Sequence, residues 1–444
     1  MNKSELNLLN NKRSFRRLGV CALSACLWLL STLPAAASPV TAFGLDAESA
    51  SQAMAVTASA KPLSAAATNP ARLMDARGGE AALGIVVSED QITINRKDAE
   101  LDTYVGWQVG LATPIPLGQI RDRIYAGFNL HVPYNGLYDV NNTAVADPVV
   151  WNNGSTARRL AMDAAFAVRL WERIAIGFGL HLMPLVTASV NIDFRGQNES
   201  SSSDVKVGYG LIPKLGFYAE PIQGLHLGFS YHAGMKLALN VPAEINISDA
   251  IGNIHVRLKG YAYTEPHTFT IGARYDFSRH AQSHLANFAL DLDFAYRHYT
   301  DPIASSANVQ LLDDDGGIMN ETDRPYQEFD GSWSLRTALT WMPIDEISAS
   351  VGYAFEKSAI PAQRNAFNVL DSDRNRIAFG ASFWLPEPWL GSFGLGFSTA
   401  AQFDIYAERN MEKYEFLVGN PGFPSIHFEG YAFAWHGSIL MRFE

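Results

Sequence analysis

Hydrophobic residues occupy every second position through much of the chain after residue 79. The clearest run is at the C-terminal end, where Tyr431, Phe433 and Trp435 begin an alternation with small or polar residues that continues to Phe443. Successive side chains of a β-strand point to opposite faces of the sheet, so this run predicts a strand with one apolar face. The same period of two marks residues 160–170, 269–277, 288–297, 333–341 and 377–385.

The length of the predicted strands separates two fold classes. A soluble β-sandwich also alternates apolar and polar residues, but its strands are usually about 3–10 residues long. Residues 205–220 and 224–240 keep strand character for longer, as strands of a tilted, membrane-spanning barrel wall do. A helical membrane protein is excluded, because no stretch after residue 37 reaches the roughly 18 apolar residues that a spanning helix needs.

Fourteen candidate strands follow one another along the chain. They cover residues 79–94, 103–113, 123–133, 157–171, 174–192, 204–220, 224–240, 253–277, 287–300, 328–341, 346–358, 372–385, 391–409 and 427–443. An even number is typical of bacterial single-chain barrels, and short connections alternate here with long polar ones such as 301–327. The sequence therefore predicts an all-β fold, a transmembrane antiparallel β-barrel over residues 79–444 with short periplasmic turns and long external loops.

The first 37 residues have the pattern of a secretory signal peptide. A basic segment ends at Arg17, an apolar run extends from Leu18 to Leu33, and Ala35 to Ala37 form a small-residue cleavage site. A membrane anchor is the alternative, but the apolar run is shorter than the roughly 20 residues that a span needs. Lipoprotein processing at Cys26 is a further alternative, against which the apolar residues after Cys26 argue.

Removal of this segment changes the remaining composition. Both cysteines lie within it, so residues 38–444 cannot form a disulfide or a thiolate metal site. The segment contains five basic residues and one acidic residue, so the net charge falls from −11 to −15 when it is removed. An acidic exported chain is a poor binder of nucleic acid, and we expect no nucleic-acid partner.

Residues 38–78 differ from everything that follows them. Gly44 to Met74 is rich in Ala, Ser and Thr and contains no aromatic residue. Such a segment buries too little apolar area to fold alone, because ordering each residue costs about 1–2 kcal/mol. We therefore expect residues 38–78 to form a hatch, or plug, packed inside the barrel lumen.

Motifs of metal and catalytic chemistry are poor. Asp371, Asp373 and Asn375 begin like a calcium-binding loop, but Arg376 and Ser382 occupy the positions of the required glycine and glutamate. Neither G-x-S-x-G nor H-E-x-x-H is present. We therefore expect no metal, no cofactor and no enzymatic activity, although an outer-membrane lipid hydrolase remains an alternative because serines and histidines occur on several predicted strands.

Several short motifs occur in a fixed order along the chain. The first is Asn69-Pro70-Ala71, which follows the Ala/Ser-rich stretch, and the others lie at residues 133–137, 227–231, 265–268, 351–355, 360–361, 373–376 and 379–380. Their order, together with fourteen predicted strands, resembles the outer-membrane long-chain fatty acid and hydrophobic-compound transporter family (FadL/TodX-like). The resemblance covers nearly all of residues 38–444.

The resemblance implies a passive transporter in the outer membrane of a Gram-negative cell. It would take up hydrophobic small molecules, with long-chain fatty acids as the first expectation, past a hatch marked by Asn69, Pro70 and Ala71. Release would be sideways into the membrane, through a gap where the third strand kinks. Pro133 and Gly136 mark that kink, and Pro133 lacks the N–H group that a strand ladder needs.

Cationic residues on the predicted lumen face are candidate partners of a ligand carboxylate. They are Lys214, Arg336, Arg374 and Arg376. Pairing of these cations with lumen acids such as Asp163 and Asp293 is the simpler reading, and the sequence does not single out one of them.

Besides its hydrophobic ligand, the barrel would contact outer-membrane lipid and lipopolysaccharide, and we expect a monomer. The alternatives are an uptake channel for aromatic hydrocarbons, a general porin and the hydrolase.

Overall fold

The computed structural model describes the greater part of the chain from Gly44 onward. The described residues are 44–116, 118, 122–134, 149–150, 160–193, 200–248, 252–277, 287–299, 308–312, 318–321, 329–362, 364, 369–385, 393–414 and 422–443. The predicted signal peptide and Gly136 lie outside these residues.

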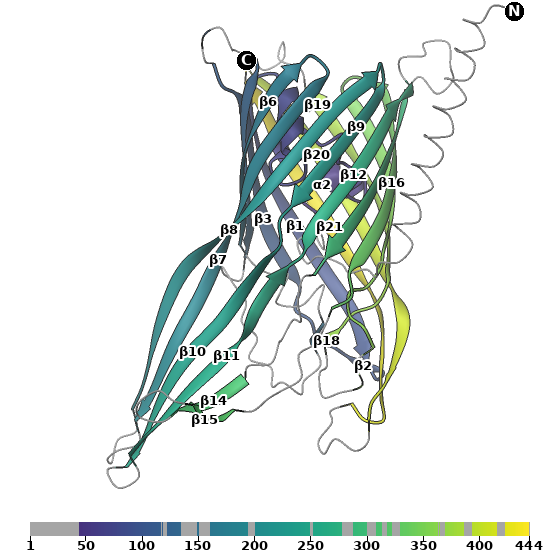
Figure 1. The fold of residues 1–444 in the computed structure, drawn as a ribbon. Helices are drawn as coiled ribbons and strands as arrows, with labels where there is room; N and C mark the ends of the chain where they lie inside the picture. The colour runs from purple at the N-terminus through teal and green to yellow at the C-terminus, as the bar shows by residue number, and fades with distance from the viewer. Residues whose placement is uncertain are drawn as a thin grey trace, which may run out of the picture.

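Fourteen strands form a closed antiparallel β-barrel (Figure 1). In order around the wall they are β1 (Gly79–Ile94), β3 (Tyr104–Pro114), β4 (Ile124–Pro133), β6 (Ala161–Trp171), β7 (Ile174–Asp193), β8 (Ser200–Ile222), β9 (Leu225–His232), β12 (His267–Asp276), β13 (Phe288–His298), β16 (Ser332–Ile344), β17 (Ile347–Glu356), β19 (Arg374–Leu385), β20 (Phe393–Glu412) and β21 (Ser425–Phe443). The barrel closes between its first and last strands, from the pair Gly79 and Phe443 to the pair Ile94 and Phe428. The predicted fold is confirmed.

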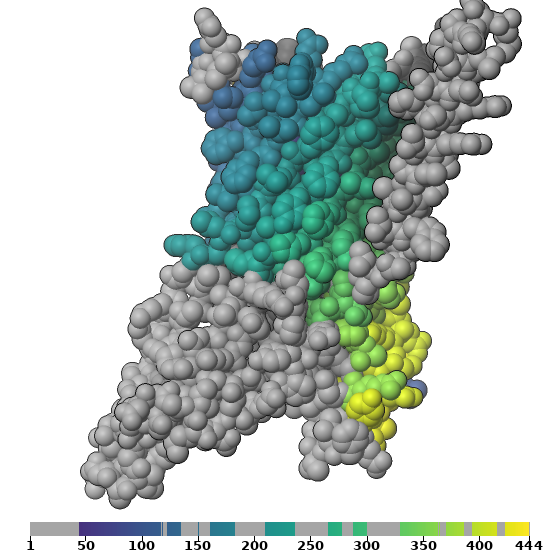
Figure 2. Space-filling view, viewed as in Figure 1, coloured from purple at the N-terminus to yellow at the C-terminus, as the bar shows by residue number. Residues whose placement is uncertain are grey.

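The wall has an apolar outer face and a polar inner face. On β3, Trp107 and Leu111 are exposed whereas Gln108 is buried, and on β16 Leu335 is exposed whereas Arg336 is buried. This arrangement is the reverse of the one in a soluble protein, because a soluble monomer rarely exposes a large contiguous apolar patch. It suits a barrel that is surrounded by lipid. Strands β8, β9 and β12 cross the front of the wall in Figures 1 and 2.

Two of the fourteen predicted strands are shorter in the barrel than the sequence suggested. The predicted strand 224–240 breaks after β9 and continues as β10 (Met235–Ser248), and the predicted strand 253–277 breaks at Pro266 between β11 (Gly252–Glu265) and β12. Pro266 has no N–H to offer a ladder. At Gly234 a Cβ atom would lie 2.6 Å from the His267 ring, so the chain can turn closely there only without a side chain.

Strands β10 and β11 leave the barrel together and build an arm beyond its rim (Figure 1). β11 pairs with β14 (Asn308–Leu312), which pairs with β15 (Ile318–Glu321), and β10 pairs in parallel with the outer end of β7. The break at Gly234 and Pro266 therefore marks where this ribbon leaves the wall.

The segment before β1 forms only short helices inside the barrel. They are α2 (Ala47–Ser51), α3 (Pro62–Ala65) and the 3-10 helix η2 (Pro70–Asp75), and nearly all of their residues are buried. Asp46 caps α2 by accepting a hydrogen bond from the Ser49 N–H (2.7 Å). None of the helices among the described residues is both long and apolar enough to cross a membrane.

A small apolar cluster, called the cap below, lies at the barrel end opposite the C-terminus (Figure 1). Short strands β5 (Val149–Val150) and β18 (Val369–Leu370) pair there in parallel, and β2 (Lys97–Asp98) folds back on the end of β1. Val150 and Leu370 pack with Met411 and Phe428. Leu370 of this cluster directly precedes Asp371, whose side chain is buried.

Asp371 lies outside the membrane-spanning strands and is 1% exposed. Burial raises the pKa of its carboxyl group to about 6, an effect that its hydrogen bond from Ser358 and the nearby Arg374 and Arg409 only partly offset. The Ser358 Oγ donates to Asp371 Oδ2 at 2.8 Å. Because the folded-state pKa lies above the unfolded value of 3.8, the charged carboxylate destabilises the folded cap above pH 6, and this penalty is absent below pH 4.

We predict that the cap opens more readily as the pH rises from 4 to 6. Hydrogen exchange of the backbone amides of residues 369–373 should accelerate over this range beyond the intrinsic rate, by an amount equivalent to about 2–3 kcal/mol. The variant Asp371→Asn should remove the dependence, and the exposed-site variant Asp98→Asn should keep it. An unchanged pH profile in Asp371→Asn would contradict the assignment.

Candidate functional site

The hatch, residues 44–78, contacts every strand of the barrel. Ala47 donates its N–H to Ser438 on β21 (3.3 Å), Gln402 on β20 donates to the Ala50 carbonyl (3.1 Å), and Asn129 on β4 donates to the Leu63 carbonyl. Contacts to the remaining strands come from α2, α3, η2 and the residues between these helices. The hatch therefore follows the inner face of the wall around its whole circumference.

Asn69 joins two parts of the hatch to the wall. Its Nδ2 donates to the Thr57 carbonyl at 2.8 Å and to the Phe217 carbonyl on β8 at 3.0 Å, while its Oδ1 accepts the Ala71 N–H at 3.2 Å. Asn69 is fully buried and Pro70 begins η2. The three residues that the sequence marked as the hatch motif thus lie at one joint, which here means a point where the hatch is hydrogen-bonded to the wall.

Thr57 is the second joint. Its N–H and its hydroxyl both donate to Asp293 Oδ2 on β13, at 2.9 and 2.7 Å. Just before it, Ala53 and Met54 have positive φ angles of 47° and 65°, a conformation that costs a residue with a side chain of order 1 kcal/mol or more. Arg336 donates to the Met54 carbonyl at 3.4 Å, so the wall holds this turn in place.

Glycines on four neighbouring strands make room for these two joints. A Cβ atom at Gly177 on β7 or Gly216 on β8 would overlap Asn69, Pro70 or Ala71, and one at Gly228 on β9 would overlap the Thr57 backbone. On β12, a Cβ at Gly272 would lie 2.8 Å from the Thr57 side chain. The wall is therefore shaped to the hatch backbone.

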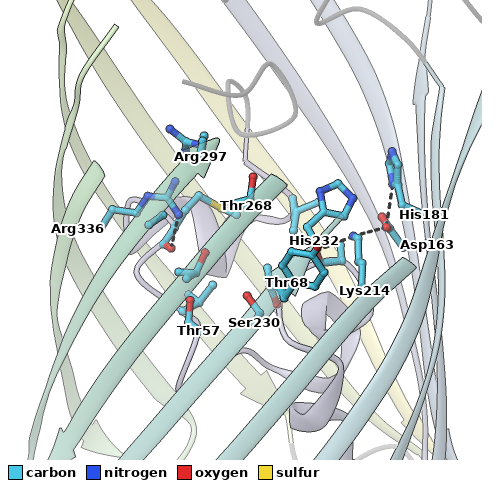
Figure 3. A pocket seen from close by; sticks show the side chains of 17 residues that line it. Thr57, Thr68, Asp163, His181, Lys214, Ser230, His232, Thr268, Arg297 and Arg336 are labelled. Atoms are coloured by element: carbon cyan, nitrogen blue, oxygen red, sulfur yellow. Dashed lines mark hydrogen bonds and ion pairs between the residues drawn. The ribbon is translucent and has the colours of Figure 1, made fainter. Parts of the chain in front are cut away.

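A cavity lies between the hatch and the wall strands β6 to β16 (Figure 3). Twelve of its 17 lining residues are polar or charged, and only Leu45, Met54, Val56, Ala67 and Ala295 are apolar. Arg297 and Arg336 lie at one end, Lys214 and His181 lie at the other, and hydroxyl groups lie between them (Figure 3).

The lysine end of the cavity is organised by Asp163. Its Oδ1 accepts a hydrogen bond from His181 Nδ1 at 2.9 Å and forms a close ion pair with Lys214. Lys214 also donates to the Ala67 carbonyl of the hatch at 2.9 Å. The side chains of all three wall residues are at least 93% buried, with exposed fractions of 6%, 1% and 7%.

The arginine end is an ion-pair network. Glu356 on β17 accepts from Arg297 at 3.1 Å and from Arg336 at 3.2 Å, and it also pairs with Arg374. Asp404 on β20 pairs with Arg374 at 3.1 Å and with Arg376 at 2.6 Å. Among the described residues, this network contains four guanidinium groups that share two carboxylates.

The candidate cations from the sequence separate into two groups. Lys214 and Arg336 line the cavity, whereas Arg374 and Arg376 do not line it and pair with acids next to it. All four have a lumen acid as partner. Pro133 ends β4, where it lies opposite Gly106 of β3, and the part of the expected kink that contains Gly136 lies outside the described residues.

Sequence reasoning missed four groups of the site. Thr57, His181, Arg297 and Glu356 were not singled out, although the period of two places Arg297 and Glu356 on the inner face of their strands. Nothing in the local sequence of Thr57 or His181 indicates its partner, because Asp293 and Asp163 are 236 and 18 residues away along the chain.

Metal-binding geometry is not assembled among the described residues, and the histidine of the cavity has no catalytic hydroxyl bonded to it there. No three histidine, cysteine or acidic side chains there lie close enough to hold a metal ion. His181 Nε2 has no hydrogen-bond partner within the described part of the chain, so the Asp163–His181 pair lacks the adjacent hydroxyl that nucleophilic catalysis needs.

A closed barrel with an apolar exterior and a filled, polar lumen defines an outer-membrane channel of the hatch-containing class. The model of the family "Outer membrane protein transport protein (OMPP1/FadL/TodX)" matches residues 28–398. The chain belongs to this family, which consists of outer-membrane transporters of hydrophobic compounds in Gram-negative bacteria and not of enzymes. No curated protein sequence matches the chain.

Solved structures share the fold at low sequence identity. A Pseudomonas aeruginosa FadL homologue superposes with a TM-score of 0.58 at 13% identity, covering 90% of this chain and 99% of that chain. The toluene transporter TodX of P. putida gives 0.57 at 14% identity, covering 91% and 99%. The toluene transporter TbuX of Ralstonia pickettii gives 0.53 at 12% identity, covering 90% and 99%.

We predict that Gly177→Val displaces the hatch without unfolding the barrel. The valine side chain would overlap the backbone of Pro70 and Ala71, and the wall ladder of β7 tolerates a β-branched residue well. Single-channel recordings in planar bilayers should then show a conductance several-fold above that of the unchanged protein.

The matched control is Gly79→Val, because a Cβ at Gly79 meets nothing closer than 3.9 Å. Both variants should keep the heat-modifiable electrophoretic mobility of a folded barrel. Equal conductance of the two variants would show that the hatch is not seated against Gly177.

Proposed function

We propose that this protein takes up long-chain fatty acids across the outer membrane. The observation that carries the proposal is the arginine end of the cavity, where Arg336 and Arg297 share the single carboxylate of Glu356 with Arg374. A guanidinium group binds a carboxylate through charge-assisted, often bidentate, hydrogen bonds. A fatty acid carries such a carboxylate on a chain that water excludes at about 0.8 kcal/mol per CH₂.

Uptake of aromatic hydrocarbons is the second candidate, because TodX and TbuX are toluene transporters by name. The cavity lining argues against it for this chain. Twelve of the 17 lining residues are polar or charged, and a ligand without polar atoms would make no hydrogen bond or ionic contact with any of them.

A general porin requires an open lumen, and the hatch argues against one. It contacts all fourteen wall strands and most of its residues are buried. The hydrolase alternative lacks a hydroxyl that is hydrogen-bonded to His181 Nε2 among the described residues. Both alternatives are therefore weaker than transport of a hydrophobic anion.

The proposed route follows the arrangement of the chain. Residues 1–37 would be removed on export, residues 38–78 would act as the hatch, and residues 79–444 would form the wall of a monomer surrounded by lipid and lipopolysaccharide. A ligand captured at the external side would reach Arg336, and it would leave sideways near Pro133 and Gly136. Described pairing of β4 with β6 ends at the pair His131 and Ala161, two residues before Pro133.

We predict that uptake of labelled oleate depends on Arg336. In Gram-negative cells that lack their own hydrophobic channel, Arg336→Gln should lower the initial rate about 10- to 100-fold, because a hydrogen bond to a charged group contributes about 1.5–3 kcal/mol. Toluene uptake should change little, since toluene makes no ionic contact.

Arg336→Lys is the matched control, because it keeps the charge and should retain more uptake than Arg336→Gln. Conductance of both variants would be recorded as a check that the hatch remains in place. Equal oleate uptake by all three proteins, or protein-dependent uptake of toluene but not of oleate, would move the assignment to hydrocarbons.

We predict that Pro133→Val slows release without weakening binding. Valine restores the N–H group that proline lacks, so β4 can extend its ladder and close the proposed exit. Oleate uptake should fall several-fold while the equilibrium affinity of the purified protein for oleate stays the same. The control is Pro114→Val at the other end of the neighbouring strand β3. A matching fall in uptake for both variants would place the exit elsewhere.

A further inference from the structure

The lysine end of the cavity carries polar groups that a simple carboxylate ligand does not use. Lys214 is already paired with Asp163 and with the Ala67 carbonyl. His181 and Thr68 line this end, with Ser230 and Thr268 between it and the arginines (Figure 3). The two ends are thus polar in different ways, since one presents two guanidinium groups and the other presents an imidazole and a hydroxyl group beside a lysine that is paired with Asp163.

The tautomer of His181 follows from its partner. Asp163 forms an ion pair with Lys214 and is therefore ionised, so its Oδ1 can only accept the hydrogen bond from Nδ1 at 2.9 Å. In the neutral form of the ring the hydrogen therefore lies on Nδ1, and Nε2 is a hydrogen-bond acceptor. His181 is 1% exposed, and none of the other described residues pairs with Nε2.

A buried acceptor of this kind favours a ligand that carries a donor. An unsubstituted acyl chain passing His181 would bury Nε2 against CH₂ groups, whereas a hydroxyl group on the chain would donate to it. Thr68 and Ser230 provide further hydroxyl groups along the same cavity.

We propose that the preferred ligand is an oxygenated long-chain acid, with its carboxylate at Arg336 and Arg297 and a hydroxyl group on the chain at His181. The proposal rests on the proposed function, because it takes the carboxylate position from it. It adds that the site distinguishes a hydroxylated acid from its unsubstituted counterpart, and it assigns that discrimination to His181.

The test is a competition experiment on the purified protein in lipid nanodiscs. Labelled stearate is displaced by unlabelled stearate and by a series of hydroxystearates that carry the hydroxyl at carbon 3, 7, 10 or 12. At least one positional isomer should displace the label about tenfold better than stearate, the effect of roughly one additional hydrogen bond. The position of the best isomer would report the separation of the two polar ends.

Variants assign the effect to His181. His181→Phe should lower the affinity for the best isomer to about that of stearate, so that the preference is lost. His181→Gln, whose amide can still accept a hydrogen bond, should retain part of the preference even if the aromatic replacement disturbs the Asp163–Lys214 pair. Thr113→Val is the matched control, because Thr113 is exposed and bonds only to the neighbouring Pro114 carbonyl among the described residues.

The outcomes separate the two proposals. Stearate binding with no isomer better than stearate would overturn the oxygenated-acid proposal and leave fatty acid transport intact. An isomer preference that both His181 variants retain would overturn the role of His181. Failure of the unchanged protein to bind stearate or any hydroxystearate would overturn both.

Discussion

The structure depends on one constraint, which is that backbone polar groups inside the membrane need partners within the protein. The wall meets it by closure, since β1 pairs with both β3 and β21 and the barrel has no open edge. The hatch cannot meet it in the same way, because its short helices leave many N–H and C=O groups without partners of their own. Those groups must be paired by side chains of the wall.

This requirement explains why the lumen is polar. Asp293 accepts from the Thr57 N–H, Lys214 donates to the Ala67 carbonyl, and Arg336 donates to the Met54 carbonyl. A lumen cation is therefore at once a hatch anchor, a member of an ion pair and a possible ligand contact. Truncation of such a cation leaves a buried charge and a backbone group unpaired, so losses of function at these positions combine a binding effect with a hatch effect.

How much the sequence could predict follows from the range of each interaction. The barrel and its strand count were predictable, because a period of two and long strands are properties of neighbouring residues. The arm was not, since the break at Gly234 becomes visible only when the His267 ring is placed beside it. The site lay between these cases. Asn69 stood out through the motif that resembles the family, and Arg336 stood out as a cation on the lumen face. The pairing of Thr57 with Asp293 joins residues 236 positions apart, and no local pattern records it.

The same contacts connect ligand binding to the hatch. Arg336 donates to the Met54 carbonyl at 3.4 Å and to Glu356 at 3.2 Å, so an anion that binds its guanidinium group competes with the hatch for the same N–H donors. Met54 and Ala53 have left-handed backbone angles, which persist only where the surroundings enforce them. A ligand that withdraws Arg336 removes one of these restraints, and Met54 is one of the hatch residues that line the cavity. Under the proposed function, recognition of the carboxylate and release of the hatch would be two results of one exchange of hydrogen bonds.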